Sequence, residues 1–548
     1  MGRLKDGAPD CLSRLDTGET HGMANAVDWF VDRHLREGES ASVAFEDPWR
    51  SLTRAALAEG TRRFAGALAA AGIGRERRLV MLLQDTVDFP IVFWGALRAG
   101  VIPVPVNTLL TAETIAHVLS DSRAEAVAIS EPLAADLAPL LRETASLRTI
   151  IVVASDGAPP AAMSGSAPPA AMDDPRAVGL DAFLAGGDPE TGTVAVSGDE
   201  VAFWLYSSGS TGMPKGVRHV HASLRATAET YGAQVLGIVP GDVMFSVAKA
   251  FHAYGLGNSM TFPMAVGARA VLLPGRPTPD AVLEVMGRYQ PSIFAGVPTL
   301  YAALLAHPMI GPKAGSDRLR RCISAGEALP EDVGLRWQRQ VGVDILDGIG
   351  STEMLHIFIS NQTDSVRYGT SGKPVPGYQA LVVDEHDRPV PHGEQGELVV
   401  KGPSAADGYW NQREKSRRTF RGEWTYTGDS YTRDAEGYYR FQGRRDEMLK
   451  VSGVWVSPFE VEEALIAHPA VLEAAVVGRE DRDGLTKPRA FVVLKAPVPD
   501  PEALAAELKD HVKQRVGVWK YPRWIEFIEA LPKTATGKIQ RFRLRDVG

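Results

Sequence analysis

Ten residues, 207–216, combine the side chains and glycines that a protein needs to hold a phosphate group. The segment reads Ser-Ser-Gly-Ser-Thr-Gly-Met-Pro-Lys-Gly and follows an apolar run at 201–206 that is typical of a buried strand. Glycine lets backbone N–H groups approach phosphate closely, hydroxyl groups donate further hydrogen bonds, and Lys215 supplies a positive charge. The spacing differs from the Walker sequence, in which Gly-Lys-Ser/Thr follows four variable residues. By itself the segment is compatible with an ATPase, a kinase or a surface turn.

Four further segments carry charged side chains that can act on a nucleotide or a metal ion. They read Asp347-Gly-Ile-Gly-Ser-Thr-Glu353, Tyr426-Thr-Gly-Asp429, Gly443-Arg-Arg-Asp-Glu-Met-Leu-Lys450 and Leu531-Pro-Lys-Thr-Ala-Thr-Gly-Lys538. A carboxylate is a suitable ligand for Mg²⁺. An ionised carboxylate only accepts hydrogen bonds, which suits a sugar diol. Taken singly, each segment is more typical of an ordinary turn or a solvated charge.

In this order, the five segments resemble the motifs of the acyl-adenylate-forming (ANL) superfamily, which contains acyl-CoA synthetases, peptide-synthetase adenylation domains and firefly luciferase. The resemblance extends over about residues 24–546. It implies that the chain binds ATP and Mg²⁺ and activates a carboxylic acid as its acyl-adenylate. The residues that it assigns to the nucleotide are Ser207, Ser208, Gly209, Ser210, Thr211, Gly212, Lys215, Asp347, Asp429 and Arg444.

The same resemblance assigns the chemistry to residues in distant parts of the chain. Thr352 is expected to contact a phosphate of the nucleotide, and Glu353 to hold the Mg²⁺. Lys538 is expected to bridge the carboxylate and the α-phosphate, a role in which one preorganised donor is typically worth about 10²–10³ in rate. Asp446 is expected to be the hinge about which the C-terminal part turns. After that turn, Lys450 is expected to help shape the passage for the thiol of CoA.

Three segments resemble the benzoate-CoA ligase branch of the superfamily. They are Phe251-His-Ala-Tyr-Gly-Leu-Gly-Asn258, Gly350-Ser-Thr-Glu-Met-Leu-His-Ile-Phe358 and Lys450-Val-Ser-Gly-Val-Trp-Val-Ser-Pro-Phe-Glu-Val-Glu462. The implied aryl pocket is a flat, mostly apolar slot. The residues assigned to it are His252, Ala253, Tyr254, Gly255, Ile349 and His356. Because the imidazole of His252 can donate a hydrogen bond, hydroxy- and amino-substituted benzoates stay open as substrates beside benzoate itself.

We therefore expect an AMP-forming acid–thiol ligase that activates benzoate or a substituted benzoate as aryl-AMP and transfers the acyl group to CoA. Ten residues follow Lys538 and hold no phosphopantetheine site, which favours free CoA as the acceptor. Three alternatives stay open. They are a stand-alone aryl-acid adenylation enzyme that loads a carrier protein, a CoA ligase for a non-aromatic acid, and a nucleotide-binding regulator that has lost catalysis.

Charge and composition narrow the possible partners. The 548 residues carry a net charge of −8, and 45% are hydrophobic and 23% charged, a globular composition without the basic excess of nucleic-acid-binding proteins. No uncharged apolar run reaches the roughly 18 residues of a membrane span, because Arg98 interrupts residues 90–106. Cys11 and Cys322 lack the spacing of a zinc site. We expect a cytoplasmic monomer or homodimer that binds small molecules and neither nucleic acid nor membrane.

Hydrophobic patterns predict the elements that position these residues. Helical stretches alternate with β-rich runs in the first part of the chain, which predicts a parallel sheet with crossover helices. Strand–loop–helix signals at 201–206 and across 243–305 predict a second doubly wound sheet. The other predicted strands are 79–83, 101–106, 149–153, 380–383, 396–401, 437–443, 471–478 and 490–494, and the predicted helices are 52–71, 459–468 and 502–516.

The predicted fold class is α/β. It consists of a large N-terminal domain of two doubly wound sheets plus a β-rich subdomain, with a small mobile C-terminal α+β lobe. The predicted parts are a flexible tail (1–22), an ATP- and acid-binding domain (23–443) and a mobile catalytic lobe (444–548). Two copies of Ala-Pro-Pro-Ala-Ala-Met, at 158–163 and 167–172, predict a surface loop.

Overall fold

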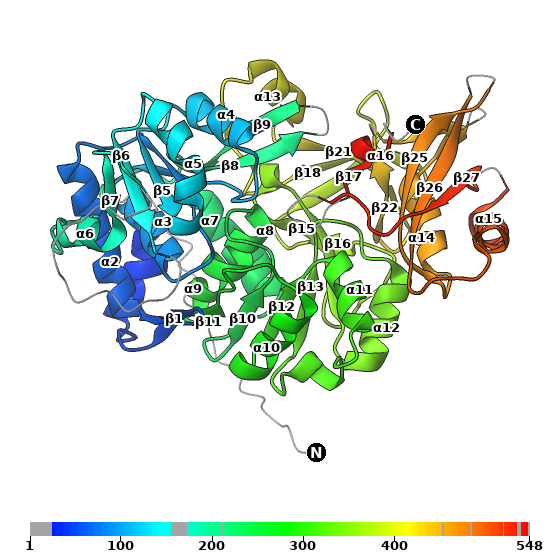
Figure 1. Cartoon of the computed structure of the whole chain (residues 1–548), viewed down its shortest axis with the longest axis horizontal. Helices are drawn as coiled ribbons and strands as arrows, with labels where there is room; N and C mark the ends of the chain where they lie inside the picture. The colour runs from blue at the N-terminus through cyan, green and yellow to red at the C-terminus, as the bar shows by residue number, and fades with distance from the viewer. Residues whose placement is uncertain are drawn as a thin grey trace, which may run out of the picture.

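The chain is described by a computed structural model. The residues described are 25–154, 172–209, 212–445, 447–451, 454–482, 485–518, 520–533 and 539–545. The predicted tail and all but the last residue of the repeated Ala-Pro-Pro-Ala-Ala-Met segments lie outside them. Figure 1 shows two large layered sheets, coloured blue to green, followed by a β-rich part and a small lobe in orange and red.

The first large sheet has five parallel strands in the order β4-β3-β5-β6-β7. They are β3 (Arg78–Leu82), β4 (Ile102–Pro105), β5 (Ala126–Ser130), β6 (Thr149–Val153) and β7 (Ala177–Gly179). One face is covered by α2 (Arg54–Ala70), α3 (Asp88–Arg98) and α6 (Leu180–Ala185), and the other by α4 (Ala112–Ser122) and α5 (Glu131–Glu143). Along β3, Leu79 and Met81 face the first group of helices, while Val80 and Leu82 face the second. The predicted crossover pattern is confirmed.

The second large sheet has nine strands in the order β16-β15-β14-β13-β12-β10-β11-β1-β2. The strands are β1 (Val43–Glu46), β2 (Ser51–Thr53), β10 (Val243–Ser246), β11 (Arg269–Val271), β12 (Ile293–Gly296), β13 (Arg321–Ser324), β14 (Ile345–Gly350), β15 (Ile357–Ser360) and β16 (Lys373–Pro374). The six from β14 to β1 are parallel, and the edge strands are antiparallel. The sheet is therefore mixed, with a parallel centre.

Helices cover both faces of this second sheet. The outer face carries α10 (Pro279–Tyr289), α11 (Pro298–Ala306) and α12 (Glu331–Val341). The inner face shares one core with α2 and α3 and carries α7 (His221–Thr227), α8 (Ala253–Leu256) and α9 (Phe262–Val266). Short turns complete this part: η2 (Asp28–Asp32), α1 (Arg33–Arg36), η3 (Ala228–Val235), η4 (Gly257–Thr261), η5 (Pro312–Gly315) and η6 (Thr352–Met354).

The strand predicted at 201–206 belongs to neither large sheet. It is the start of β8 (Val201–Gly209), which pairs antiparallel with β9 (Gly212–Val220), and β9 pairs with β19 (Gly408–Tyr409). The predicted strand–loop–helix order is therefore wrong here, because the phosphate segment lies across the turn of a hairpin. Val217 and His219 are buried at alternate positions of β9, which is the period of a strand and not of a helix.

The β-rich part and the C-terminal lobe follow the predicted order. One sheet joins β17 (Gln379–Val383), β18 (Gln395–Lys401), β20 (Phe420–Arg421), β21 (Trp424–Arg433) and β22 (Tyr439–Arg444), beside α13 (Arg413–Thr419). The lobe contains β23 (Leu449–Val451), β24 (Val454–Val456), β25 (Val471–Glu480), β26 (Thr486–Leu494), β27 (Trp524–Phe527), α14 (Pro458–Ile466), α15 (Pro501–Val516) and α16 (Arg541–Arg545). The predicted α/β fold with a C-terminal α+β lobe is confirmed, whereas the boundary at residue 444 stays a prediction.

The lobe contacts the rest of the chain through polar and aromatic pairs. The backbone N–H of Ile539, the residue after Lys538 in sequence, donates to Oε1 of Glu327 at 3.1 Å. Phe459 of α14 packs edge-on against Phe441 of β22, with ring centroids 5.3 Å apart. Among the described helices, none is long and apolar enough to cross a membrane.

Candidate active site

Lys215 and Glu353, which are far apart in sequence, lie together in the structure. The Lys215 ammonium is 3.4 Å from Oε1 of Glu353. Tyr409 holds both groups, because its hydroxyl donates to the same oxygen at 2.7 Å and its ring lies 3.8 Å below the ammonium. We call these three residues the lysine–glutamate–tyrosine cluster. It joins β9, the turn after β14 and strand β19.

Burial and charge in this cluster act on each ionisable group. Burial lowers the pKa of Lys215, although the neighbouring Glu353 opposes that shift. Burial acts to raise the pKa of Glu353, but Lys215 and the Tyr409 hydroxyl outweigh it, so the pKa of this carboxyl is lowered overall. Glu353 is therefore ionised at neutral pH, although it is largely enclosed by protein. A carboxylate held in this form is suited to binding a divalent cation.

The turn that carries Glu353 is fixed from several sides. Ser351 caps the short helix η6, since its hydroxyl accepts the N–H of Met354 at 3.2 Å. The Nε2 of His219 lies 2.8 Å from the carbonyl oxygen of Thr352, and because a carbonyl only accepts, Nε2 carries the proton. Burial lowers the pKa of His219 to about 4, so the ring is neutral. The N–H of Ala406 donates to the carbonyl of Glu353 at 2.8 Å.

Asp429 and Arg444 form the second charged pair of the site. They are directly opposite each other on β21 and β22, and Nη1 of Arg444 donates to Oδ1 of Asp429 at 2.9 Å. The same Nη1 lies 3.1 Å from the carbonyl oxygen of Thr427. Arg444 is near enough to Lys215 for its positive charge to contribute to the lowered pKa of that lysine, after burial. The Asp429–Arg444 pair and the lysine–glutamate–tyrosine cluster are therefore neighbours.

Asp347 lies in β14, deep below the charged groups. Its carboxyl accepts the N–H of Leu329 at 3.4 Å, and it is only 4% exposed. Burial raises its pKa to about 8, so the carboxyl keeps its proton at neutral pH. In its ionised form the Asp347 carboxylate would raise the pKa of Tyr254 in the predicted aryl pocket and that of Tyr431, which is two residues after Asp429.

Aromatic rings gather around His356, one of the predicted aryl-pocket residues. Its ring centroid is 4.5 Å from that of Phe262, 5.2 Å from Tyr231 and 5.6 Å from Tyr254. Its Nε2 lies 3.3 Å from the backbone oxygen of Tyr254, which places the proton on Nε2. Burial lowers its pKa to about 3, and its Nδ1 is buried with no hydrogen-bond partner among the described residues.

The remaining predicted pocket residues lie on or next to the helix α8 and strand β14. His252 precedes α8 and packs edge-on against Phe251, with centroids 4.7 Å apart. The Tyr254 hydroxyl is 3.1 Å from the carbonyl oxygen of Gly296 and 3.2 Å from that of Ile323. These contacts tie α8 to the ends of β12 and β13. Ala253 and Ile349 are partly buried against the main core.

Glycine is required at position 255 for a packing reason. A Cβ atom there would lie 2.0 Å from the carbonyl oxygen of Lys249, inside the backbone that leads into α8. Gly255 therefore lets the start of α8 approach the preceding backbone segment closely.

Several predicted site residues or their side chains are not among the described parts of the chain. Ser210, Thr211, Asp446 and Lys538, and the side chains of Ser208 and Lys450, lie outside the described residues. The ends of the hairpin are described: Gly209 pairs with Gly212, and Ser207 with Lys215. The Ser207 hydroxyl is buried without a hydrogen-bond partner among the described residues, which leaves a donor available beside Lys215.

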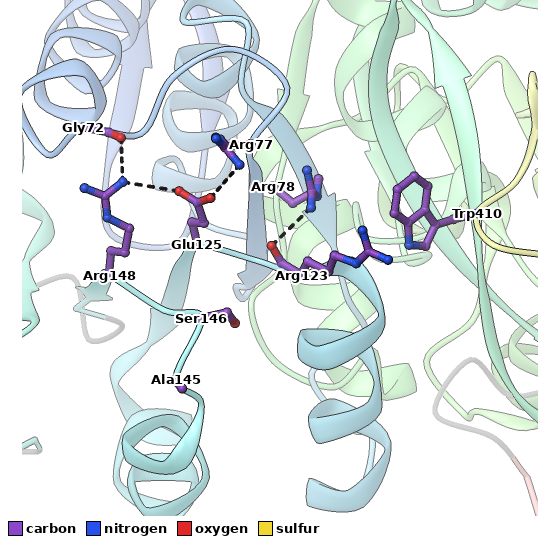
Figure 2. A pocket seen from close by; sticks show the side chains of 9 residues that line it. All are labelled: Gly72, Arg77, Arg78, Arg123, Glu125, Ala145, Ser146, Arg148 and Trp410. Carbon is purple, nitrogen blue, oxygen red and sulfur yellow. Dashed lines mark hydrogen bonds and ion pairs between the residues drawn. The ribbon is translucent and has the colours of Figure 1, made fainter.

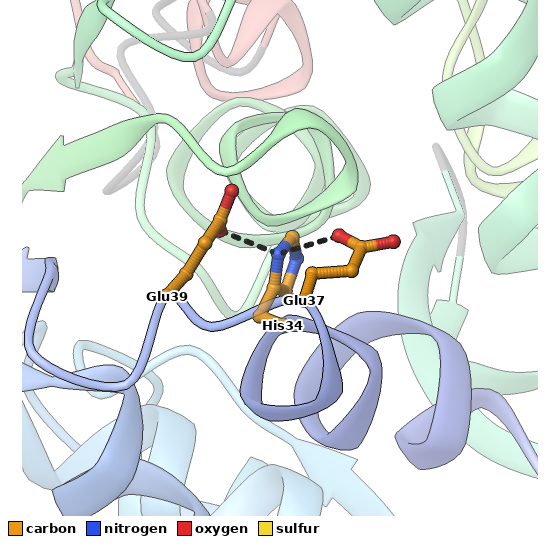
Figure 3. A group of neighbouring side chains, drawn as sticks. All are labelled: His34, Glu37 and Glu39. Carbon is orange, nitrogen blue, oxygen red and sulfur yellow. Dashed lines mark hydrogen bonds and ion pairs between the residues drawn. The ribbon is translucent and has the colours of Figure 1, made fainter.

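Two other groups of residues resemble binding sites. A cavity of about 630 Å³ lies at the first sheet, and its lining includes Trp410, which directly follows Tyr409 of the lysine–glutamate–tyrosine cluster (Figure 2). His34, Glu37 and Glu39 lie close enough to share a metal ion (Figure 3). However, Nε of Arg54 is 3.3 Å from the Glu39 oxygen that His34 contacts, so positive charge is already present and we assign no metal there.

Two family models match the chain. Residues 31–410 match the AMP-binding enzyme model, and residues 460–538 match the model of the AMP-binding enzyme C-terminal domain. The chain belongs to the AMP-binding enzyme family. The predicted resemblance to the ANL superfamily is confirmed.

Relatives of this AMP-binding enzyme cover nearly its whole length. It is similar to the benzoate–CoA ligase of Thauera aromatica, with 51% identity over 95% of each chain. It is similar to the 4-hydroxybenzoate–CoA/benzoate–CoA ligase of Rhodopseudomonas palustris, with 49% identity over 95% of this chain and 94% of that one. Its structure is similar to that of a benzoate CoA ligase from Burkholderia xenovorans LB400, with a TM-score of 0.86 and 46% identity over 95% of this chain and 100% of that one.

The structure of this AMP-binding enzyme adds residues that the sequence reading missed. Tyr409 completes the charged cluster, and His219 fixes the backbone of Thr352. Neither stands in a predicted motif, and the two-residue strand β19 is too short to give a periodic signal.

We expect replacement of Tyr409 by Phe to weaken binding of Mg²⁺·ATP, most strongly at low pH. The change removes a hydrogen bond that lowers the pKa of Glu353, so this pKa rises. As the pH falls, Glu353 of the variant therefore becomes protonated earlier than Glu353 of the wild type. One such bond is worth about 1 kcal/mol, hence up to roughly a fivefold loss of affinity, which grows as the pH falls towards 5. Titration calorimetry between about pH 5 and pH 8 measures this affinity for Mg²⁺·ATP.

Tyr438→Phe is the matched control, because its partly buried hydroxyl donates to the backbone oxygen of Ser365 and, among the described residues, has no contact with the lysine–glutamate–tyrosine cluster. Its affinity profile should follow the wild type. An unchanged profile for Tyr409→Phe would contradict the role of Tyr409.

Proposed function

We propose that this AMP-binding enzyme is an ATP-dependent aryl-CoA ligase of the AMP-forming acid–thiol type. It activates benzoate or a substituted benzoate as aryl-AMP and transfers the acyl group to CoA. The observation that carries the proposal is the lysine–glutamate–tyrosine cluster, next to the Asp429–Arg444 pair, in a chain about half identical to proteins named benzoate–CoA ligases.

The charged groups support binding of ATP with Mg²⁺. In this proposal Lys215, Ser207 and Gly209 hold the β- and γ-phosphates, together with Ser208, Ser210, Thr211 and Gly212 of the same segment. The pairing of Ser207 with Lys215 and of Gly209 with Gly212 supports this assignment. Glu353 fits Mg²⁺, because one ionised carboxylate plus phosphate oxygens is the ligand set that this ion prefers. When bound, Mg²⁺ neutralises phosphate charge. Thr352 lies beside Glu353 to contact a phosphate.

The nucleoside end of ATP is assigned to residues of the neighbouring strands. The carboxylate of Asp429 accepts hydrogen bonds from the ribose hydroxyls, and Arg444, already bonded to Asp429, is the second ribose contact. We also assign the buried Asp347 to the nucleotide side of the site.

The reaction has two transfers that balance without a redox partner. An oxygen of the aryl carboxylate attacks the α-phosphorus, the α–β phosphoanhydride bond breaks, and pyrophosphate leaves. The CoA sulfur then attacks the acyl carbon, the acyl–oxygen bond to phosphate breaks, AMP leaves, and the thiol proton is released. In the first step Lys538 offsets the repulsion between the two anions.

The two steps need different surfaces of the C-terminal lobe. In our proposal the lobe, residues 444–548, turns about Asp446 after pyrophosphate leaves, which withdraws Lys538 and brings Lys450 and Ser452-Gly453 to the passage for the thiol. The contact of Ile539 with Glu327 supports a starting arrangement in which the end of the lobe lies against the N-terminal domain.

The acyl pocket favours a flat aromatic acid. Rings of Tyr231, Tyr254 and Phe262 surround His356, and Ala253, Gly255 and Ile349 complete an apolar wall. Imidazole groups of His252 and His356 offer polar contacts, so hydroxy- and aminobenzoates are included in the proposed substrate class. We place the enzyme in the cytoplasm as a monomer or homodimer with small-molecule substrates.

Incubation with ATP, Mg²⁺, CoA and single acids tests the proposal. The panel contains benzoate, hydroxy- and aminobenzoates, cyclohexane carboxylate and short fatty acids. We expect one aryl-CoA and one AMP per benzoate consumed, with kcat/KM highest for an aromatic acid. AMP release without a thioester on free CoA would instead favour a carrier-protein-loading enzyme. Preference for a non-aromatic acid, or no AMP with any acid, would contradict the aryl-ligase proposal.

Lys538→Ala separates the two steps. Pyrophosphate exchange is expected to fall by about 10²–10³, the usual loss for one preorganised donor. CoA transfer from supplied aryl-AMP should largely persist, because Lys538 is withdrawn in that step. Lys533→Ala is the control, as its ammonium pairs with Glu473 within the lobe. Equal loss of both half-reactions in Lys538→Ala would contradict the two-arrangement mechanism.

A further inference from the structure

Four arginines line the 630 Å³ cavity on the first sheet. Arg78 begins β3, Glu125 immediately precedes β5, and Arg148 immediately precedes β6, so the cavity lies at the amino ends of these parallel strands. Arg77 and Arg123 complete the basic lining, and Trp410 closes one side (Figure 2). Ligands of parallel sheets usually bind beyond the carboxyl ends, so this cavity is on the opposite edge.

The positive charge of the cavity is only partly neutralised. Glu125 is the one acidic residue in the lining, and both Arg77, at 2.9 Å, and Arg148, at 3.5 Å, share its carboxylate. Four guanidinium groups therefore face one carboxylate, in a protein whose net charge is −8. Such a local excess of one sign attracts a ligand of the opposite sign.

Two of the arginines are held by the backbone and fix the shape of the cavity. Arg78 donates to the carbonyl oxygens of Ser122 at 2.6 Å, Glu76 at 2.8 Å and Arg123 at 3.3 Å. Arg148 donates to the carbonyl oxygen of Gly72 at 3.0 Å. Burial lowers the pKa of Arg78, and the charges of Arg77 and Arg123 lower it further. Repulsion among the arginines is thus present, and Glu125 offsets only part of it.

The other two arginines have donors left for a ligand. Among the described residues, the Arg123 guanidinium has no hydrogen-bond or ion-pair partner, and it lies 5.5 Å from the ring centroid of Trp410. Arg77 pairs only with Glu125, and its side chain is 55% exposed. Each guanidinium carries a planar set of N–H donors that matches the oxygen atoms of a phosphate.

The cavity is connected to the nucleotide site through Trp410. Its indole N–H donates to the carbonyl oxygen of Asp121 at 2.8 Å, and its ring packs on Trp204 of β8, with centroids 4.8 Å apart. Its backbone N–H donates to Gly216 of the phosphate hairpin at 2.8 Å, and it directly follows Tyr409. The cavity is therefore a separate hollow that shares a wall with the phosphate hairpin.

We propose that this arginine cavity is a second anion site, distinct from the ATP site, that binds a small phosphorylated compound carrying at least two negative charges. The rigid pair Arg78 and Arg148 shapes the hollow, and Arg77 and Arg123 supply the donors. Its volume lies within the range of about 300–1,000 Å³ that is usual for small-ligand sites. The proposal does not depend on which acid the enzyme activates.

Titration with inorganic pyrophosphate tests the site in the full-length enzyme. The ATP site is first saturated with a non-hydrolysable ATP analogue, so that heat of binding reports only other sites. We expect the wild type, with its ATP site already occupied by the analogue, to bind one equivalent of pyrophosphate. In Arg77→Gln/Arg123→Gln this binding should weaken by about tenfold or more, because charge-assisted hydrogen bonds are lost. Added salt should weaken it in the wild type.

Arg36→Gln/Arg418→Gln is the matched control, since it also removes two exposed arginines, here ones that pair with carboxylates outside the cavity, and leaves the cavity intact. The control should bind pyrophosphate like the wild type. Both double variants should keep the wild-type KM for ATP, which shows that they fold. No binding to the pre-saturated wild type, or equal weakening in both double variants, would overturn the proposal.

A parallel titration with ADP distinguishes the source of the phosphate group. Tighter binding of ADP than of pyrophosphate, lost in Arg77→Gln/Arg123→Gln, identifies a nucleotide as the ligand. Binding of pyrophosphate at equal or higher affinity identifies an inorganic phosphate compound. In both cases the loss in the double variant supports the site.

Discussion

The contact between Lys215 and Glu353 is the constraint on which the site depends. Enclosing an ammonium and a carboxylate in protein is costly unless each finds a partner. Here the two groups are partners of each other, and Tyr409 binds both through its hydroxyl and its ring. The three segments that carry them must therefore meet, and the small sheet of β8, β9 and β19 is where they do.

Strand β14 of the second large sheet positions residues next to this cluster. β14 delivers Asp347 and the turn with Glu353, while His219 and Ser351 hold the backbone of that turn. Strand β15, which begins directly after His356, pairs with β14, so in our proposal the phosphate and acyl parts of the site share one support. A carboxylate and a phosphate can thus be brought together by rigid elements, which is the main requirement for a reaction between two anions.

Much of this arrangement could be predicted from the sequence, because strong local patterns carry it. Short, continuous β-rich apolar runs predicted the strands near 79–83 and 149–153, and short motifs identified Lys215, Glu353 and Asp429. The hairpin at 201–220 was missed, because a glycine-rich turn after a strand resembles the start of a helix. Tyr409 and the arginine cavity were missed for another reason: their members come together only by long-range packing, which leaves no local signal.

A double-mutant cycle between Lys215 and Glu353 tests most directly whether they act as one unit. The measurement is kcat/KM for ATP in aryl-adenylate formation, for Lys215→Met, Glu353→Gln and the double variant. If the pair acts as a unit, the double variant loses little more than the worse single variant, as is usual for residues that function together. If the loss of kcat/KM in the double variant equals the product of the losses in the two single variants, the residues act independently, which would contradict the account.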